Sequence, residues 1–273
     1  MMERDIVCDK GTEAAEILTV RQVSKAFPFH NTPNAFKALD NISFSVKDKE
    51  IVSLIGPSGC GKSTLLAIIG GFEQPTTGEV CFRKQPIEGP SRDRGFVFQD
   101  DALFHWLTVE ENVGYGLKVQ RFPRPARLEI VQHSLQLVGL TQFRNSKPRQ
   151  LSGGMRQRVA IARALATDPK ILLLDEPFGA LDVLTRKTMQ RELARICDQT
   201  RKTVIMVTHS IEEAILLSDR IFVMAKAPST IRETLFVDLV RPRSPRDPTF
   251  RDLELHIADL VLGESQNNRG ESG

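Results

Sequence analysis

The stretch most able to do chemistry is residues 56–64, where three glycines precede a lysine and two hydroxyl side chains. Glycine lets the backbone curl closely around an anion because it has no Cβ, and amides at a helix start would point at that anion. Lys62 would reach the β- and γ-phosphates of a nucleotide, and the Ser63 hydroxyl would bind Mg²⁺. We therefore predict a phosphate-binding P-loop made of Gly56, Pro57, Ser58, Gly59, Cys60, Gly61, Lys62, Ser63 and Thr64.

The flanking segments favour a P-loop over a glycine-rich turn that merely joins two elements. Residues 51–55 are an apolar run typical of a buried strand, and residues 65–69 are typical of the start of a buried helix. Strand, glycine-rich turn and helix is the order that a P-loop requires. Cys60 is interpreted as a small, tolerated loop residue rather than a redox switch.

A second chemical element is the pair Asp175 and Glu176, which follows the apolar residues 171–174. Ligands of open parallel sheets sit at the carboxyl ends of the strands. Asp175 could hold Mg²⁺ through its water shell, and Glu176 could act as the base that polarises an attacking water. The alternative is a pair of carboxylates that stabilises a helix N-terminus.

Two further polar residues end predicted strands. His209 follows the strand predicted at residues 203–208, and Gln99 follows the one at 95–98. His209 could contact a γ-phosphate and detect its loss, and Gln99 could contact the γ-phosphate or Mg²⁺. Taken alone, each is better explained as a structural residue.

A second candidate anion site opens a predicted helix, and we name it the Ser-Gly-Gly turn (Ser152, Gly153 and Gly154). Serine is a favoured N-cap, and two glycines allow an anion to approach closely. The chain has only one P-loop, so use of both sites requires two copies that face each other. Each copy would offer this turn to the nucleotide on its partner's P-loop.

The order of these motifs resembles that of the ATP-binding subunits of ABC transporters. The resemblance covers about residues 25–225 and includes the P-loop, Gln99, residues 151–154, Asp175 with Glu176, residues 179–182, and His209. It implies an α/β fold, a P-loop NTPase of the ABC ATPase kind with a RecA-like parallel sheet core, an antiparallel β subdomain and a helical subdomain. It also implies that ATP and Mg²⁺ bind.

The resemblance assigns roles to single residues. Glu176, His209 and Gln99 would be catalytic, and Ser63, Gln99 and Asp175 would hold the metal. Asp182 would lie beside the nucleotide. Phe27 fits an aromatic that stacks on adenine, with Phe29 as the second choice. Met155 departs from the family, which most often has Gln there, and we expect hydrolysis to survive because that side chain is not the phosphate donor.

The hydrophobic pattern predicts where the elements lie. A nucleotide-binding domain is expected at residues 16–235, with its helical part at about 100–165, between a disordered segment 1–15 and a C-terminal part 236–273 that holds a linker, a short helix and a disordered tail. Strands are expected at 17–27, 39–46, 51–55, 78–82, 95–98, 170–175, 203–208 and 220–224, and helices at 109–117, 126–138, 153–165, 183–200, 211–217 and 252–262.

Composition is that of a soluble globular protein, with 26% charged and 41% hydrophobic residues. The formal net charge of +3 is too small to argue for nucleic acid. No apolar run approaches the ~20 residues that cross a bilayer, and no secretory signal is expected. The four cysteines form no metal-binding spacing, which fits a reducing cytosol.

The resemblance implies separate membrane partners. In the family the surface after the glutamine docks onto permease subunits, and here residues 100–109 contain the only tryptophan, Trp106. Packing of this stretch into the helical subdomain is the alternative. The protein would lie peripherally at the cytoplasmic face of the bacterial inner membrane, and a solute-binding protein would be an indirect partner.

Residues 87–90, Trp106 and residues 176–182 are similar to those of the nitrate, sulfonate and taurine importers, and most like taurine importers. Aliphatic sulfonates and nitrate remain alternatives. The main rival from another class is a soluble ABC-type ATPase that acts on nucleic acid. The single cassette, with no heptad stretch between its motifs, argues against that rival, as the missing acceptor site argues against a P-loop kinase.

Overall fold

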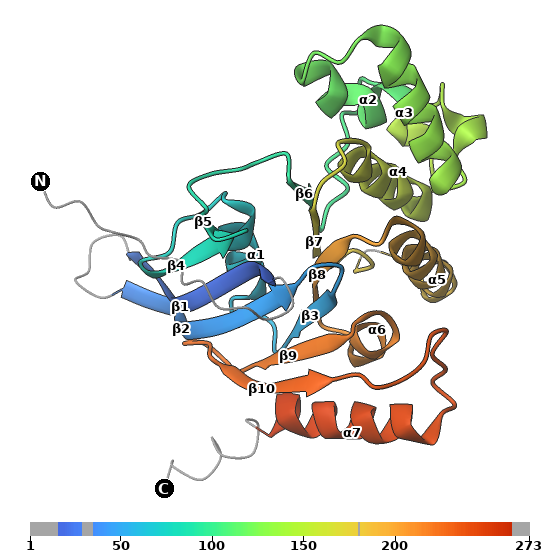
Figure 1. The fold of residues 1–273 in the computed structure, drawn as a ribbon. Coiled ribbons are helices and arrows are strands. Elements are labelled where there is room, and N and C mark those ends of the chain that lie inside the picture. The colour runs from blue at the N-terminus through green and yellow to red at the C-terminus, as the bar shows by residue number, and fades with distance from the viewer. Residues whose placement is uncertain (1–15, 29–34, 180, 264–273) are drawn as a thin grey trace, which may run out of the picture.

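The computed structural model describes residues 16–28, 35–179 and 181–263, which form two sheets with helices between and around them (Figure 1). The first sheet is antiparallel, in the order β2-β1-β4-β5. Its long strands carry an alternating buried face, as Leu18 and Val20 on β1 show. The strands of this sheet are β1 (Glu16–Pro28), β2 (Ala35–Lys47), β4 (Thr77–Phe82) and β5 (Gln85–Pro86).

The second sheet forms the core and has the order β10-β9-β3-β8-β7-β6. All neighbouring strands in it are parallel except β10, which pairs antiparallel with β9. Parallel strands end at one edge, so the segments that follow β3, β6, β7 and β8 meet there. The strands are β3 (Ile51–Ile55), β6 (Arg94–Val97), β7 (Ile171–Asp175), β8 (Thr203–Thr208), β9 (Arg220–Met224) and β10 (Ile231–Phe236).

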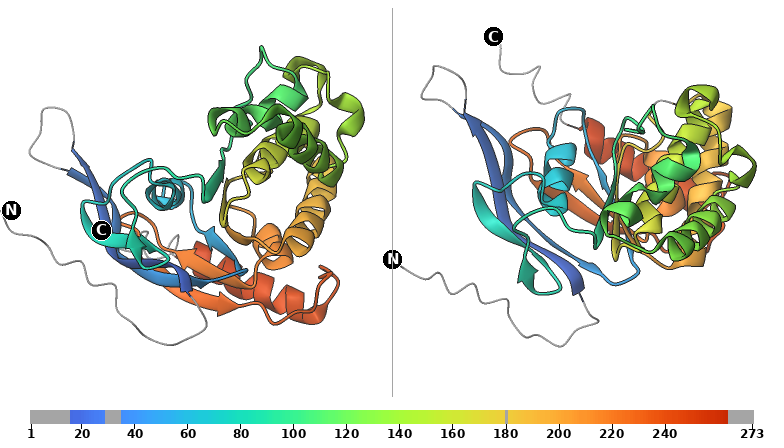
Figure 2. Two further views of the ribbon diagram at one scale, coloured as in Figure 1. Left: turned by 45° about the horizontal axis from the view of Figure 1, so that its top comes forward. Right: turned by 90° about the horizontal axis from the view of Figure 1, so that it is seen from above.

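Helix α1 (Lys62–Gly70) lies between the two sheets, as Figure 2 shows. Its apolar residues share one buried cluster with both layers, for example Leu66 with Leu18 of β1 and Leu173 of β7. Burying each large apolar side chain stabilises the folded state by about 1.5–3 kcal/mol, and this holds the helix between the sheets. The start of α1, which carries the P-loop lysine, is therefore held by two layers.

The opposite face of the core sheet is covered by α5 (Val183–Thr200) and α6 (Ile211–Leu217). Leu172 and Val204 point to this face, whereas their neighbours Leu173 and Ile205 point to α1, as strand geometry requires. A separate helical lobe holds α2 (Val109–Val119), α3 (Arg124–Leu137) and α4 (Gly153–Ala166), with short 3₁₀ turns at Thr141–Phe143 and Pro148–Gln150 (Figure 2).

The predicted architecture of a parallel core sheet, an antiparallel subdomain and a helical subdomain is confirmed. Strand β10 was not predicted, because its residues are only half-buried or exposed at the sheet edge. Helix α7 (Pro248–Leu262) begins four residues before the predicted start. Asp247 caps it by accepting a hydrogen bond from the Thr249 amide at 2.9 Å, and proline suits the first helical position.

The chain beyond β10 packs back onto the core. Phe250 and Ile257 of α7 are fully buried in a cluster with Ile215 of α6 and Ile221 of β9. Of the segments predicted to be disordered, residues 1–15 and 264–273 lie outside the described residues, as does Phe29. The disordered tail was predicted from Gly263, which the structure describes as the residue that ends α7, its amide donating to the Asp259 carbonyl at 2.8 Å. No described helix combines the length and apolarity needed to cross a membrane.

Candidate active site

The P-loop joins β3 to α1 in the predicted place. Its glycines are required by the backbone: Gly59 has φ +76° and Gly61 has φ +93°, and a Cβ at Gly61 would come within 2.8 Å of the Leu39 side chain. The first helical hydrogen bond runs from the Leu65 amide to the Gly61 carbonyl at 2.9 Å. By helix geometry the amides of residues 62–64 are left for an anion.

Lys62 lies over this loop with only 5% of the residue exposed. Its Nζ donates to the carbonyl oxygens of Gly56 at 2.9 Å and Pro57 at 3.0 Å, and lies 3.7 Å from the Cys60 sulfur. A buried ammonium beside free amides makes a strongly positive cradle, which fits the phosphates of a nucleotide.

The Ser63 hydroxyl donates to Asp175 Oδ1 at 2.9 Å. A hydroxyl and a carboxylate are the hard oxygen donors that Mg²⁺ prefers, and Mg²⁺ usually takes its remaining ligands from water and substrate phosphates. Burial raises the pKa of the Asp175 carboxyl above its ordinary value of 3.8; the Ser63 hydrogen bond opposes this, and the neighbouring Glu176 carboxylate adds to it. A divalent cation would offset that cost, so this pair fits the predicted metal role.

Asp175→Asn should therefore raise the melting temperature of the ligand-free chain at pH 7. A raised native pKa means that ionised Asp175 destabilises the folded state. This cost falls as the pH drops below the raised native pKa, and it is gone well below 3.8, where the carboxyl is protonated in both the folded and the unfolded state. Asp182→Asn is the matched control with the opposite sign, because hydrogen bonds from Thr185, first the side chain and then the backbone amide, lower the pKa of Asp182. A lower melting temperature for Asp175→Asn at pH 7 would contradict the account.

Glu176 is the point where three strand ends meet. Its Oε2 lies 3.4 Å from Gln99 Nε2 and 3.3 Å from His209 Nδ1. Glu176 has φ +44°, a region that costs a non-glycine residue free energy and is common at functional sites. Its amide donates to the Val207 carbonyl at 2.9 Å, which helps to hold this conformation. The structure thus brings together the three residues predicted to be catalytic.

The Ser-Gly-Gly turn starts α4 as predicted, with the Ser152 hydroxyl accepting from the Met155 amide at 3.3 Å. Met155 itself packs against the apolar core of the helical lobe. Asp182 caps α5 by accepting from the amides of Leu184 and Thr185. Within the described part of one chain, no hydrogen bond or ion pair joins the Ser-Gly-Gly turn to the P-loop, so the two predicted phosphate contacts are not united in a single copy.

Phe27 is half-buried near the end of β1. Lys25 Nζ lies 5.0 Å from the centre of its ring and also pairs with Glu73 Oε1 at 2.7 Å. The Lys25 ammonium therefore lies against one face of the Phe27 ring. Sequence patterns did not single out Lys25, although residues two apart on a strand share a face; its pairing with Glu73 appears only in the folded chain.

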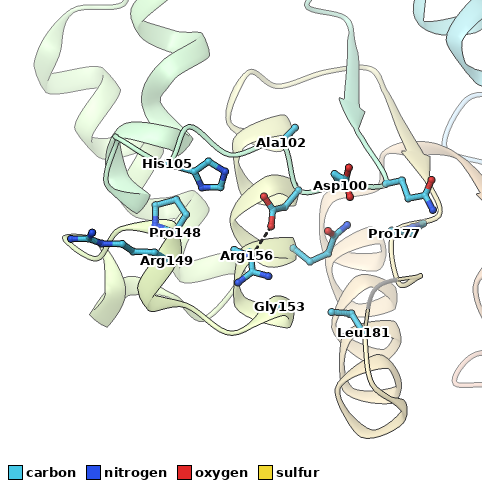
Figure 3. A pocket seen from close by; sticks show the side chains of 12 residues that line it. Asp100, Ala102, His105, Pro148, Arg149, Gly153, Arg156, Pro177 and Leu181 are labelled. Carbon is cyan, nitrogen blue, oxygen red and sulfur yellow. Dashed lines mark hydrogen bonds and ion pairs between the residues drawn. The ribbon is translucent and has the colours of Figure 1, made fainter.

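A cavity of about 510 Å³ connects Gln99 with the Ser-Gly-Gly turn. Figure 3 shows His105 and Arg149 on one side of it and Leu181 on the other. Arg156 crosses it as an ion pair, Nε to Asp101 Oδ2 at 2.7 Å. The segment after Gln99 is thereby tied to α4, a link that the sequence pattern did not indicate.

Another residue missed by sequence reasoning is Glu213, in the first turn of α6 and only 4% exposed. Its carboxylate accepts from the Thr208 hydroxyl at 2.5 Å and from Gln190 Nε2 of α5 at 3.1 Å. Thr208 also accepts from the Ser210 amide at 3.0 Å, so the turn that carries His209 is fixed from both sides. The only available signal in the sequence was an acidic residue four positions after His209.

Glu213→Ala should lower kcat about tenfold or more without weakening ATP binding. The change leaves the buried hydroxyl of Thr208 and the amide of Gln190 without their acceptor, which frees the His209 turn. Steady-state kinetics and nucleotide titration separate the two effects. Glu213→Gln, which keeps a carbonyl acceptor, should retain more activity than the alanine variant. An unchanged kcat in a folded Glu213→Ala protein would show that the turn needs no such support.

The sequence of this chain matches a known protein family over the residues that form the site. A family model described as "ABC transporter" matches residues 39–179, which contain the P-loop, Gln99, the Ser-Gly-Gly turn, Asp175 and Glu176.

Three similar proteins have names that state a solute. The bicarbonate transport ATP-binding protein CmpC of Synechococcus elongatus is 49% identical over 88% of this chain, which matches 37% of that relative. The nitrate import ATP-binding protein NrtD of the same species is 43% identical over 88% of this chain and 89% of its own length. The taurine import ATP-binding protein TauB of Roseobacter denitrificans is 45% identical over 79% and 80%.

A solved structure shares the fold. The dimeric, post-hydrolysis state of the ATP-binding cassette MJ0796, bound to ADP and Pi, superposes with a TM-score of 0.72 at 35% identity. It covers 82% of this chain and all of that one.

Proposed function

This chain belongs to the ABC transporter family as an ATP-binding subunit, and on that premise we propose that it hydrolyses ATP to energise the import of a small anionic or zwitterionic solute, with taurine as the first candidate. The observation that carries the catalytic part is the meeting of Gln99, Glu176 and His209 beside the P-loop. The solute is proposed on sequence resemblance.

The residues suggest how hydrolysis proceeds. Lys62 and the amides at the start of α1 hold the phosphates and offset their charge. Ser63 and Asp175, with Gln99 nearby, would hold Mg²⁺, which supplies charge neutralisation at the phosphoryl group when bound. Glu176 accepts a proton from the attacking water, while His209 and Gln99 orient the water and the γ-phosphate. General base catalysis of this kind contributes roughly 10²–10⁴-fold.

We propose that the active form is a homodimer with composite sites. In the described part of the chain no hydrogen bond or ion pair joins Ser152 and its two glycines to the P-loop of the same copy, although they form a helix start suited to an anion. A second copy can bring its Ser-Gly-Gly turn to that phosphate. The dimeric form of the MJ0796 cassette with ADP and Pi supports this arrangement.

The proposed partner surface is the aromatic patch that follows Gln99, formed by Phe104, Trp106 and Tyr115. Trp106 is 70% exposed, so packing into the helical core does not explain it. The Phe104 ring lies 5.4 Å from Trp106 and 4.5 Å from Tyr115. Clustered aromatics on a rigid lobe are typical anchors of protein interfaces. We assign this patch to the integral membrane permease subunits.

Trp106→Glu should reduce copurification of the chain with its permease by about tenfold or more, because a charge replaces a central apolar anchor. ATP hydrolysis by the free chain should be unchanged. Leu262→Glu, at an exposed apolar residue on α7, is the matched control and should copurify like the wild type. Loss of association in both variants, or in neither, would remove the patch from the interface.

The identity of the solute is tested by measuring solute uptake in cells that lack this protein. Taurine uptake should be lost and should return with the wild-type gene but not with Lys62→Ala. Alkanesulfonates, nitrate and bicarbonate are measured in parallel, since relatives named for nitrate, taurine and bicarbonate lie at 43–49% identity. Loss of nitrate or bicarbonate uptake with taurine unaffected would reassign the solute within the same function.

A peripheral position at the cytoplasmic face of the bacterial inner membrane follows from this proposal, with the solute-binding protein as an indirect partner. We propose no nucleic-acid partner. Pull-down of integral membrane proteins supports the transporter assignment. Hydrolysis stimulated by DNA or RNA, with no membrane partner, would instead support a soluble ATPase.

A further inference from the structure

A second cavity of about 830 Å³ lies away from the P-loop, between α5, α6 and residues 241–246. We call it the basic groove. Its walls carry six cationic side chains, Lys187, Arg191, Arg195, Arg241, Arg243 and Arg246, and two acidic ones, Asp198 and Glu212. Nothing in the proposed hydrolysis cycle uses these residues.

Three of the arginines build the walls. Arg243 donates to the carbonyl oxygens of Ile215 at 2.6 Å and Val237 at 3.1 Å, which ties the 241–246 segment to α6. Arg241 pairs with Asp219 at 2.7 Å. Arg195 pairs with Glu192 at 3.0 Å on α5. Burial, reinforced by the Arg241 charge, lowers the pKa of Arg243 to about 10, so it stays cationic at neutral pH.

The other three cations have their charged ends available. Lys187, Arg191 and Arg246 are exposed, and no side-chain hydrogen bond or ion pair involves them among the described residues. Lys187 and Arg191 are one helical turn apart on α5, so they share a face, and Arg246 comes from the opposite wall. Asp198 and Glu212 likewise have no ion-pair partner in the described chain, and they leave the cations in excess.

We propose that the basic groove binds a small molecule with two or more phosphate or carboxylate groups. The volume lies within the range of small-molecule sites, and arginine and lysine donors pair most strongly with such anions. Leu216, Leu217 and Pro242 in the same lining offer apolar contact to a carbon skeleton.

Such a ligand would act on the active site through the helices that it bridges. Helix α5 begins at the Asp182 cap, and α6 begins two residues after His209. A ligand that draws α5 and α6 together would therefore move Asp182 and His209 relative to each other. This regulatory part rests on the proposed function, whereas binding itself does not.

Binding is tested on the full-length Lys62→Ala protein, whose P-loop is disabled, by calorimetric titration with inorganic pyrophosphate and with citrate. We expect saturable binding of at least one probe, weakened about tenfold or more by the double change Lys187→Glu with Arg191→Glu. Arg92→Glu, an exposed arginine outside the groove, is the matched control and should bind like the parent.

The regulatory part is tested by ATP hydrolysis at fixed free Mg²⁺ in proteins that keep Lys62. The same probe should change the hydrolysis rate of the wild-type protein but not that of the double variant Lys187→Glu with Arg191→Glu.

The outcomes separate the two proposals. No binding of either probe at millimolar concentration, or equal binding after charge reversal, would overturn the groove and leave the ATPase assignment standing. Binding of a hexaglutamate peptide without either small probe would overturn it in favour of a protein partner. Binding to the groove, together with no ATPase activity in the wild-type protein, would retain the site and remove only its regulatory role.

Discussion

Lys62→Ala is expected to reduce ATP hydrolysis by at least ~10²-fold, the scale for loss of one well-placed electrostatic contact to a transition state. Lys62 is buried, and its ammonium is held by the carbonyls of Gly56 and Pro57 within the loop that would surround the phosphates. No other lysine or arginine belongs to this loop. Alanine removes the charge and leaves the free amides as the remaining phosphate donors.

The measurement is phosphate release under saturating ATP, with thermal melting to show that the variant folds. Lys84→Ala, in the exposed turn between β4 and β5, serves as the matched control and should hydrolyse ATP like the wild type. Full turnover by a folded Lys62→Ala protein would refute the assignment of the P-loop.

Glu176→Gln is expected to abolish turnover while ATP binding persists, and so to trap a dimer. Glutamine keeps the size of the side chain and can still contact Gln99 and His209, which lie 3.4 Å and 3.3 Å from Oε2. It cannot accept the proton of the attacking water, a loss of roughly 10²–10⁴-fold. ATP would then remain between two copies.

Gel filtration of Glu176→Gln with Mg²⁺ and ATP should show a dimer, and without nucleotide a monomer. The double variant Glu176→Gln with Lys62→Ala should stay monomeric, since it lacks the charge that holds ATP. A monomer at saturating ATP, with binding verified by titration, would rule out nucleotide-driven pairing.

The elements whose limits sequence patterns predicted best have a clear apolar run or a capping residue at their ends. Strand β8 and helices α5 and α6 begin and end at the predicted residues, because apolar runs and caps such as Asp182 mark their limits. Strand β10 lacks such a pattern, since it lies at the sheet edge with every residue half-buried or exposed. Its position is set by pairing with β9, a contact that no local pattern encodes.

The residues of the candidate site also fall into a predicted group and a group that was not predicted. Gln99, Glu176 and His209 were each predicted from a strand end, and parallel pairing of β6, β7 and β8 brings those ends together. Lys25, Asp101 with Arg156, and Glu213 were not predicted. Lys25 pairs with Glu73, Asp101 with Arg156, and Glu213 with Gln190. These partners lie far apart in the sequence, so only the folded arrangement reveals the pairs.

The composite site is tested most directly by a crystal structure of the Glu176→Gln protein with ATP and Mg²⁺. We predict two copies per assembly, with each γ-phosphate in contact with Lys62 of one copy and Ser152 of the other. A structure in which ATP fills the P-loop while every Ser152 lies far from any nucleotide would contradict the account.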